Sequence, residues 1–576
     1  MDIQRMVLVL IFGMSAVFLW NEWQKFTHPQ PAPTVAAAQS GASSGTASPP
    51  SSSSVLPSTP SSAAPPAPGT AAIPGSTPAL PASTAAAPAG ERITLETDLL
   101  RVVVNTTGGV IEEVDLKTEQ GTVDKTKPYQ LLLKTNDRIH IEQAGLLGDG
   151  LPNHKTEYTA TPGSRTLEGT EPLQLRLSAP VTQGASAGSK VDQVITLRRG
   201  SYVIEVAFEI ANASQQPIAA TAYFHLLRDN KMPAGESSMV PTYTGAAVYT
   251  EMDKFKKVDW SDIEKRKIKF ATKSDNGWVA MVEHYFVAAI VPPPKTEHEV
   301  YADKVDELYR AGVKISAPAI APGTTGRIAA PIYVGPQQQD VLEKTAPGLE
   351  LVVDYGIFHV IAAPLFALLS WLYNLVGNWG WAIILLTILI KAVFYPLNAA
   401  SARSMAKLKV LGPKMKALQE QYANDKQQLQ IRMMEMYKIE KINPLGGCLP
   451  IVVQIPVFIA LYWVLLGAVE LRHAPWWGWI QDLSAPDPWY ILPVLYAFTA
   501  WIQVKLQPAA PGMDPMQQKI MQFMPLIFSV MFVFFPSGLV LYWFVQNVLT
   551  IVQQWHVNRM LQAEAKVKAA TAAARR

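Results

Sequence analysis

A lysine stands deep within an apolar stretch of this 576-residue chain. Lys391 lies in the segment WAIILLTILIKAVFYPL, about twelve residues after Trp379, or roughly 18 Å along a helix. A charge at mid-depth in a membrane costs on the order of 3 kcal/mol, so we expect it to face protein or a water-filled cavity. Thr387 precedes it by one turn and would add a hydroxyl to the same polar wall. The lysine stem could instead extend toward the cytoplasmic surface, and the residues leave both arrangements open.

Few other residues of the sequence have types and spacing that suggest a binding or catalytic site. Gln454, Gln503, Gln546 and Asn547 lie in apolar segments, where hydrogen bonds between helices are the favoured interpretation and membership of the polar wall is the alternative. The sequence contains no HExxH motif, phosphate-binding glycine loop or convincing nucleophile arrangement. Its single cysteine, Cys448, excludes an intramolecular disulfide and a cysteine-based metal cluster. We therefore expect neither an enzyme nor a cofactor or metal site.

Apolar segments of membrane-spanning length dominate the second half of the chain. At the N-terminus, residues 1–22 predict an uncleaved signal anchor, because Asn21–Lys25 is a poor peptidase site; a cleaved signal peptide is the alternative. Residues 355–376 predict an amphipathic helix lying along the membrane surface. Six spans are expected in all: the anchor and five in a core at 377–560, namely Trp379–Leu397, Gly446–Leu466, Trp489–Leu506, Ile520–Phe535 and Gly538–Gln554.

The distribution of charge predicts the orientation, although the net charge is only +3. Basic residues are retained on the cytoplasmic side, and they are concentrated in the loop 399–441 and the tail 561–576. The loop Glu470–Pro488 has one strong base, Arg472, and three tryptophans typical of the outer interface. We therefore expect both termini in the cytoplasm. The basic residues of the first loop are Arg403, Lys407, Lys409, Lys414, Lys416, Lys426, Arg432, Lys438 and Lys441.

The cytoplasmic loop 399–441 predicts a helical hairpin that divides at Ala423–Asp425. Apolar residues recur at three- and four-residue steps on both sides of that break. Methionine adapts to varied apolar ligands, so the hairpin is a candidate contact for hydrophobic segments; packing of one helix on the other is the equally strong alternative. The methionines concerned are Met405, Met415, Met433 and Met436.

Two further regions precede the core. Residues 23–90 are almost entirely Ala, Ser, Pro, Gly and Thr and predict a disordered tether. Residues 91–349 predict a large antiparallel β-sandwich in the periplasm. Tyr202–Ile210 alternates with the period of a half-buried strand, and Leu100–Asn105 followed by Val110–Leu116 has the form of a hairpin.

Several motifs together resemble the YidC/Oxa/Alb membrane protein insertases, specifically the Gram-negative YidC type. They are Tyr395-Pro-Leu397, Asn443-Pro-Leu-Gly-Gly-Cys-Leu-Pro450 with Gln454-Ile-Pro456, Asp514-Pro-Met516, Phe523-Met-Pro525 and Phe535-Pro-Ser-Gly-Leu539 with Leu541-Tyr542.

The resemblance implies a five-helix core around a hydrophilic groove that is open to the cytoplasm and lipid. Lys391 stands where the family usually has an arginine, and so keeps the charge without the planar fork of donors. Tyr542-Trp543 replaces a frequent tyrosine pair. The implied substrate groove comprises Lys391, Thr387, Gln454, Tyr542 and Trp543.

The resemblance further implies insertion and folding of inner-membrane proteins, alone or beside the Sec translocon. Expected partners are nascent hydrophobic membrane proteins, ribosomes contacted at rRNA through the basic tail, and anionic lipids.

Two other functions stay open from the residues alone. A transporter or channel would use the lysine to bind an anionic solute, although no inverted repeat is evident. A membrane-tethered enzyme or carbohydrate-binding protein would act through the β-sandwich, and paired carboxylates in a pocket would favour it.

Overall fold

The computed structural model describes residues 90–236, 242–422, 425–439, 449–506, 523–524, 527 and 529–573. Residues 1–89, with the expected anchor and nearly all of the tether, lie outside this part, as do residues 440–448, 507–522 and 574–576. The predictions for these segments, and for parts of the span Ile520–Phe535, therefore remain predictions.

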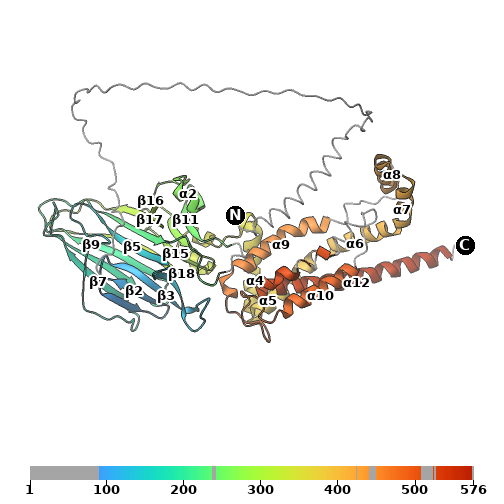
Figure 1. Ribbon diagram of the computed structural model, residues 1–576, viewed down its shortest axis with the longest axis horizontal. Helices are drawn as coiled ribbons and strands as arrows, with labels where there is room; N and C mark the ends of the chain where they lie inside the picture. Colours follow the sequence, from blue (N-terminus) through green and yellow to red (C-terminus); the bar gives the residue numbers. More distant parts are fainter. Residues whose placement is uncertain are drawn as a thin grey trace, which may run out of the picture. The chain divides into compact units, whose positions relative to one another are not determined.

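Two antiparallel sheets form the region after residue 90, and each contains nine described strands (Figure 1). In spatial order, the first sheet consists of β1 (Arg92–Glu96), β2 (Leu100–Asn105), β3 (Val110–Gln120), β4 (Pro128–Lys134), β5 (Ile139–Leu147), β10 (Thr221–Arg228), β17 (Leu308–Ser316), β16 (His298–Val305) and β13 (Lys273–Ser274). The second consists of β12 (Lys254–Val258), β11 (Gly245–Thr250), β14 (Trp278–Val282), β15 (Phe286–Ile290), β18 (Thr325–Pro336), β9 (Val203–Ala211), β8 (Lys190–Leu197), β7 (Leu173–Pro180) and β6 (Thr159–Ala160).

The predicted sandwich is confirmed, and its alternating pattern explains how the layers meet. In β9, Ile204, Val206, Phe208 and Ile210 are buried while the intervening glutamates are partly exposed. Phe208 contacts Phe224 of the opposite sheet, with ring centroids 6.0 Å apart. The core therefore lies between the sheets, as expected when one face of each sheet is apolar.

The predicted hairpin is also present, because β2 pairs with β3 in antiparallel register. Its turn contains Gly108 and Gly109 at φ 78° and 61°. A Cβ at Gly108 would lie 2.1 Å from the carbonyl oxygen of His154, so only glycine fits there.

A buried ion pair lies within the sandwich. The guanidinium of Arg228 is 3.1 Å from the Glu283 carboxylate, and both side chains are almost fully buried. Tyr129 donates a hydrogen bond of 2.7 Å to the same carboxylate. Burial, followed by the charge of Arg228, holds the pKa of the neighbouring His140 well below its usual range. His140 is therefore neutral, and within the described part of the chain Arg228 is the cation that balances the charge of Glu283.

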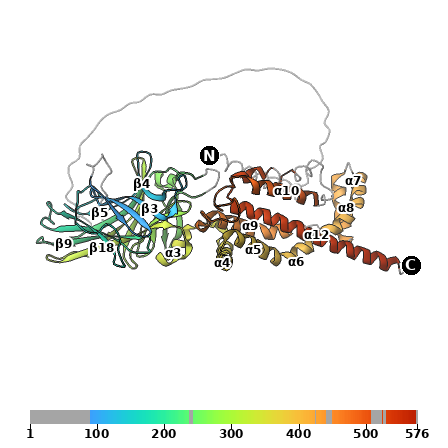
Figure 2. The same ribbon diagram turned by 90° about the horizontal axis from the view of Figure 1, so that it is seen from below.

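Short helices lie between β12 and β13 of the sandwich and after β18, where they precede the longer helices of the helical region (Figure 2). The short elements are α2 (Trp260–Glu264), α3 (Gln339–Thr345), η1 (Leu349–Val352) and η2 (Gly356–Phe358). The others are α4 (His359–Val376), α5 (Trp379–Val393), α6 (Tyr395–Val410), α7 (Gly412–Gln421), α8 (Lys426–Ile439), α9 (Leu449–Gly467), η4 (Val469–Leu471), α10 (Ile491–Leu506), η5 (Phe532–Phe534) and α12 (Ser537–Ala573).

Two of the expected helical stretches are divided. The predicted span Trp379–Leu397 divides, because the chain bends by 56° between α5 and the start of α6. The first stretch of the predicted hairpin also divides, because α7 begins at Gly412–Pro413, where proline favours the first turn of a new helix. Helix α7 contacts α8.

Helix length and hydropathy single out α4 among the described residues as able by itself to cross a membrane. The bent pair α5 and Tyr395–Ser401 passes the same test only when counted as one span, and two shorter apolar helices cover Val453–Gly467 and Ile491–Leu506. Helix α4 was expected to lie on the membrane surface, and its length permits either placement.

Truncation of Glu283 should destabilise the sandwich, because it would leave the buried Arg228 charge without a counter-ion. We expect Glu283→Ala to lower the free energy of unfolding by about 3 kcal/mol. The control is Glu307→Ala, which removes a carboxylate whose side chain is 95% exposed. Denaturant unfolding of the purified full-length chain measures both, and equal effects would contradict this assignment.

Candidate functional site

The ammonium of Lys391 lies against α12. Its Nζ donates a hydrogen bond of 2.9 Å to the hydroxyl of Thr550, a residue 159 positions later in the chain. The Thr550 hydroxyl in turn donates to the carbonyl oxygen of Gln546 at 2.6 Å. Lys391 is partly buried, and α5 packs directly on α12. The lysine is therefore satisfied by a polar group of a neighbouring helix.

Thr387 and Gln454, two other predicted groove residues, differ from Lys391 in their burial and hydrogen bonding. The side chain of Thr387 is fully buried, and its hydroxyl donates to the Ile383 carbonyl oxygen at 2.7 Å within α5. The Thr387 hydroxyl therefore donates its proton within its own helix. Gln454 lies in α9 and is partly exposed. Lys391 is the predicted groove residue that the structure connects to a second helix by a hydrogen bond.

One face of α12 carries polar side chains around Thr550. Gln546 and Gln553 stand four residues before and three residues after it, so all three share a face. Gln546 Oε1 and Gln553 Nε2 are buried and have no hydrogen-bond partner among the described residues. One free acceptor and one free donor therefore lie on the face of α12 that carries Thr550. The spacing was visible in the sequence, but nothing there identified Thr550 as the partner of Lys391.

Tyr542 and Trp543 lie in an aromatic cluster. Tyr542 is 2% exposed, and its ring stacks on Phe458 of α9 with centroids 6.2 Å apart. Trp543 is partly exposed and meets Phe458 edge-on at 4.4 Å and Phe532 at 5.6 Å. The cluster joins α9, η5 and α12, and Trp543 is the member of the pair with surface left for another apolar group.

The described methionines of the predicted hairpin, which α7 and α8 form, are mainly buried. Met415 and Met436 are 1% and 9% exposed, and the Tyr437 hydroxyl contacts the Met415 sulfur at 3.3 Å between α7 and α8. Met433 is partly buried, and the side chain of Met405 lies outside the described part. These positions favour packing for Met415 and Met436. Other apolar residues of α8 are exposed instead: Ile431, Met434 and Ile439.

Arg472 connects the loop after α9 to the β-sandwich. Its guanidinium pairs with Glu119 at 3.5 Å and donates to the Gln120 carbonyl oxygen at 2.5 Å. It also lies over the rings of Tyr129 and Phe286, 5.4 and 5.2 Å from their centroids. The side chain is only 4% exposed. A single arginine therefore makes ionic, hydrogen-bonding and cation–π contacts with the sandwich.

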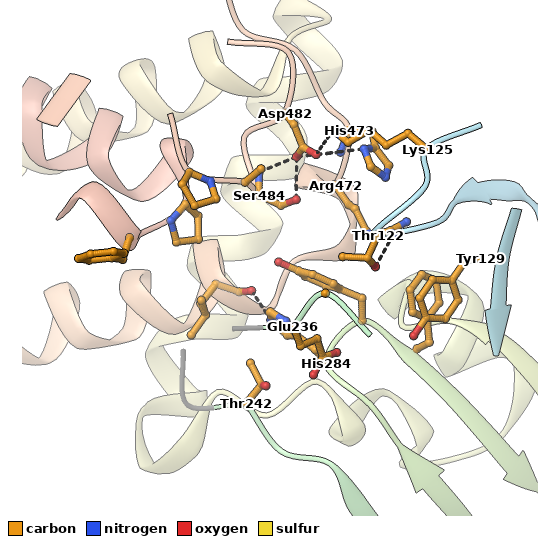
Figure 3. A pocket seen from close by; sticks show the side chains of 18 residues that line it. Thr122, Lys125, Tyr129, Glu236, Thr242, His284, Arg472, His473, Asp482 and Ser484 are labelled. Carbon is orange, nitrogen blue, oxygen red and sulfur yellow. Dashed lines mark hydrogen bonds and ion pairs between the residues drawn. The ribbon is translucent and has the colours of Figure 1, made fainter. Parts of the chain in front are cut away.

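The same loop is folded around Asp482 (Figure 3). The Asp482 carboxylate accepts hydrogen bonds from the backbone and side chain of Ser484 at 3.0 and 2.7 Å, and His473 Nδ1 lies 3.0 Å away. Burial opposes ionisation, but the bonds from His473 and Ser484 outweigh it and hold the pKa of Asp482 well below its usual range. Lys125 of the β3–β4 connection adds a second ionic contact at 3.4 Å. Asp482 is therefore an ionised centre that the loop is built around.

A cavity of about 250 Å³ lies between this loop and the sandwich (Figure 3). Its walls include Glu236, His284 and Arg472. His284 Nε2 donates to the Leu466 carbonyl oxygen at 2.9 Å, which joins β14–β15 to the end of α9. Burial lowers the pKa of His284 to about 4, while burial and the nearby Glu283 charge raise the pKa of Glu236 to about 8. Both groups are therefore uncharged near neutral pH.

No group of three His, Cys, Asp or Glu side chains suited to a metal ion occurs in the described part of the chain.

Comparison with known proteins identifies the family. The model of the 60Kd inner membrane protein family matches residues 371–565, and the model of the YidC periplasmic domain matches residues 92–368. A membrane protein insertase YidC of Aromatoleum aromaticum is 50% identical over 569 residues, which are 98% of this chain and 99% of the relative. The chain belongs to the YidC family of membrane protein insertases. The YidC of Dechloromonas aromatica is 48% identical over the same shares of 98% and 99%.

A crystal structure of an active YidC insertase is also similar, with 17% identity, a TM-score of 0.36 and coverage of 80% of this chain and 91% of that one. Membership of the YidC family confirms four expectations. The chain is an inner-membrane protein with a periplasmic β-sandwich; it acts on membrane proteins as an insertase, and it is not an enzyme.

Removal of the Arg472 side chain should release the loop from the periplasmic domain. We expect Arg472→Ala to raise amide hydrogen exchange in residues 469–486 by about a hundredfold, corresponding to about 3 kcal/mol for breaking a buried ion pair. Arg199→Ala, at an exposed position of the same domain, is the control. Unchanged exchange in Arg472→Ala would show that the arginine does not hold the loop.

The pH dependence of this junction should contain two opposing contributions. His284 has a folded pKa below its usual 6.5, so its contribution is present above pH 6.5 and is lost as pH falls toward 4. Glu236 has a folded pKa above its usual 4.5, so its contribution is present below pH 4.5 and is lost as pH rises through 8. Between pH 5 and 7, each contribution changes the stability of the junction by up to about 2 kcal/mol. Because the two changes have opposite signs, they nearly cancel in the wild type.

Single substitutions separate these contributions. Protection of residues 466–472, corrected for intrinsic exchange, should increase from pH 7 to 5 in His284→Gln, where Glu236 acts alone. It should decrease over the same range in Glu236→Gln. Parallel pH profiles in the two variants would contradict the assignment.

Proposed function

We propose that this YidC-family chain inserts membrane proteins by admitting the polar tail of the substrate into a groove beside Lys391. The observation that supports the proposal is the hydrogen bond between Lys391 and Thr550, which joins α5 to α12 through polar side chains within an apolar bundle. A charge at this depth is stable only beside polar groups or water. The same environment lowers the cost of bringing a second polar group, that of the substrate, into the membrane.

The substrate tail would be attracted by the positive charge. Two unit charges about 8 Å apart attract by about 2 kcal/mol at an effective dielectric constant of 20. The free acceptor of Gln546 and free donor of Gln553 could pair with backbone groups of the tail. The following hydrophobic segment would then enter lipid beside the helices, and burial of its apolar surface would drive the step without a nucleotide.

The cytoplasmic hairpin would make the first contact with the hydrophobic segment. Ile431, Met434 and Ile439 expose between 48% and 78% of their surface on α8. These residues are better placed for this contact than the buried Met415 and Met436. Trp543 would provide an apolar contact at the aromatic cluster, since Tyr542 is enclosed there.

The arrangement in the membrane completes the proposal. The chain would have six spans, comprising an anchor at residues 1–22 and five in the core at 377–560, with both termini in the cytoplasm. The tether would occupy 23–90 and the periplasmic domain 91–349. Helix 355–376 would lie at the membrane surface. The chain would act alone or beside the Sec translocon, and its basic segments would contact anionic lipid and ribosomal RNA.

Charge reversal at Lys391 tests the proposal. In vesicles that contain only this protein, Lys391→Glu should slow insertion of a two-span substrate with an acidic outer tail by about a thousandfold, because an attraction of about 2 kcal/mol is replaced by a repulsion of the same size. A substrate with a neutral tail should be affected much less. Lys391→Ala should be intermediate.

Lys344→Glu is the control, since it reverses a charge on a periplasmic side chain that is 80% exposed. Equal slowing of both substrates by Lys391→Glu would contradict attraction of the tail. Wild-type vesicles that insert no more than empty ones would contradict autonomous insertion and favour transport of an anionic solute as the next hypothesis.

A further inference from the structure

The hydroxyl of Thr550 is the one hydrogen-bond partner of the Lys391 ammonium within the described part of the chain. Thr550 has already donated its proton to the Gln546 carbonyl oxygen one turn earlier. The rotation of the hydroxyl is thereby fixed, and its lone pairs are directed at the ammonium. Thr550 can act only as an acceptor toward Lys391.

A lysine needs such a partner more than an arginine does. Its ammonium is a compact charge on a flexible four-carbon stem, and the stem can carry the charge toward the cytoplasmic surface. The bond to Thr550 opposes that displacement. It occupies one of three N–H donors and leaves two for another acceptor.

We propose that Thr550 is a positioning residue that holds the Lys391 ammonium on the α12 side of the groove, with two N–H donors available to the acidic tail of the substrate. This inference rests on the proposed groove function and extends it to a residue of α12. The neighbouring Gln546 and Gln553 lie on the same face of α12. The ammonium is therefore held against the face of α12 that also carries free neutral hydrogen-bonding groups.

Two substitutions of similar shape isolate the hydroxyl. Thr550→Val retains the branched side chain without its oxygen, and Thr550→Ser retains the oxygen. In vesicles containing the full chain, we expect Thr550→Val to slow insertion of the acidic-tailed substrate about tenfold, the scale of a hydrogen bond to a charged group. Insertion of the neutral-tailed substrate should change less than about twofold, and Thr550→Ser should remain within about twofold of wild type for both.

A double-mutant cycle separates positioning from packing. If Thr550 acts through the ammonium, Thr550→Val has no further effect once Lys391→Ala is present. A tenfold loss that persists in the Lys391→Ala background, or that is equal for both substrates, would overturn the proposal.

Chemical labelling tests the contact without relying on insertion. The full-length chain is treated with a membrane-permeant acetylating reagent, and modification of Lys391 is quantified by peptide mass spectrometry. We expect modification to be several-fold faster in Thr550→Val than in wild type or Thr550→Ser, with Lys505 as the internal reference. Equal labelling of Lys391 in all three would overturn the positioning role, even if the groove function stands. Faster labelling in Thr550→Val, with no insertion by wild-type vesicles, would support the contact and contradict the groove function.

Discussion

The need to stabilise one ammonium within an apolar bundle constrains the helical region. Lys391 requires a polar partner, and the partner it has, Thr550, belongs to a helix far along the chain. The bond therefore requires α5 and α12 to pack together at a defined depth. The face of α12 that carries Thr550 also carries Gln546 and Gln553, each with a buried polar atom that has no partner among the described residues. A polar strip between helices is the minimum needed for a substrate tail to enter without losing all of its hydrogen-bond partners.

The loop between α9 and α10 provides a connection between the helical region and the periplasmic domain. Arg472 is enclosed by residues of the sandwich, and His284 holds the end of α9 through the Leu466 carbonyl. Tyr129, which lies under Arg472, also donates to the buried Glu283 carboxylate. The loop between α9 and α10 is thus linked, through Arg472 and Tyr129, to the buried ion pair of Arg228 and Glu283.

Much of the architecture follows from local patterns in the sequence. The two-residue period of β9 and the hairpin form of Leu100–Asn105 and Val110–Leu116 predicted the sandwich, and the depth of Lys391 in an apolar segment marked the candidate site. The partner of Lys391 could not be predicted, because a contact across 159 residues depends on helix packing. For the same reason, spacing did not reveal that Met415 is buried between α7 and α8. The bend after Val393 was missed, because apolar composition continues across it.

The central claim is that a substrate tail passes along the face of α12 that carries Thr550. Photocrosslinking from adjacent positions tests it, because successive residues of a helix point about 100° apart. A photoreactive residue would replace Gln553, on that face, or Val552, which is 55% exposed. During insertion of a stalled acidic-tailed substrate, we expect its tail to crosslink to position 553 and not to 552. Crosslinking at 552 alone, or equally at both, would contradict a groove at this face.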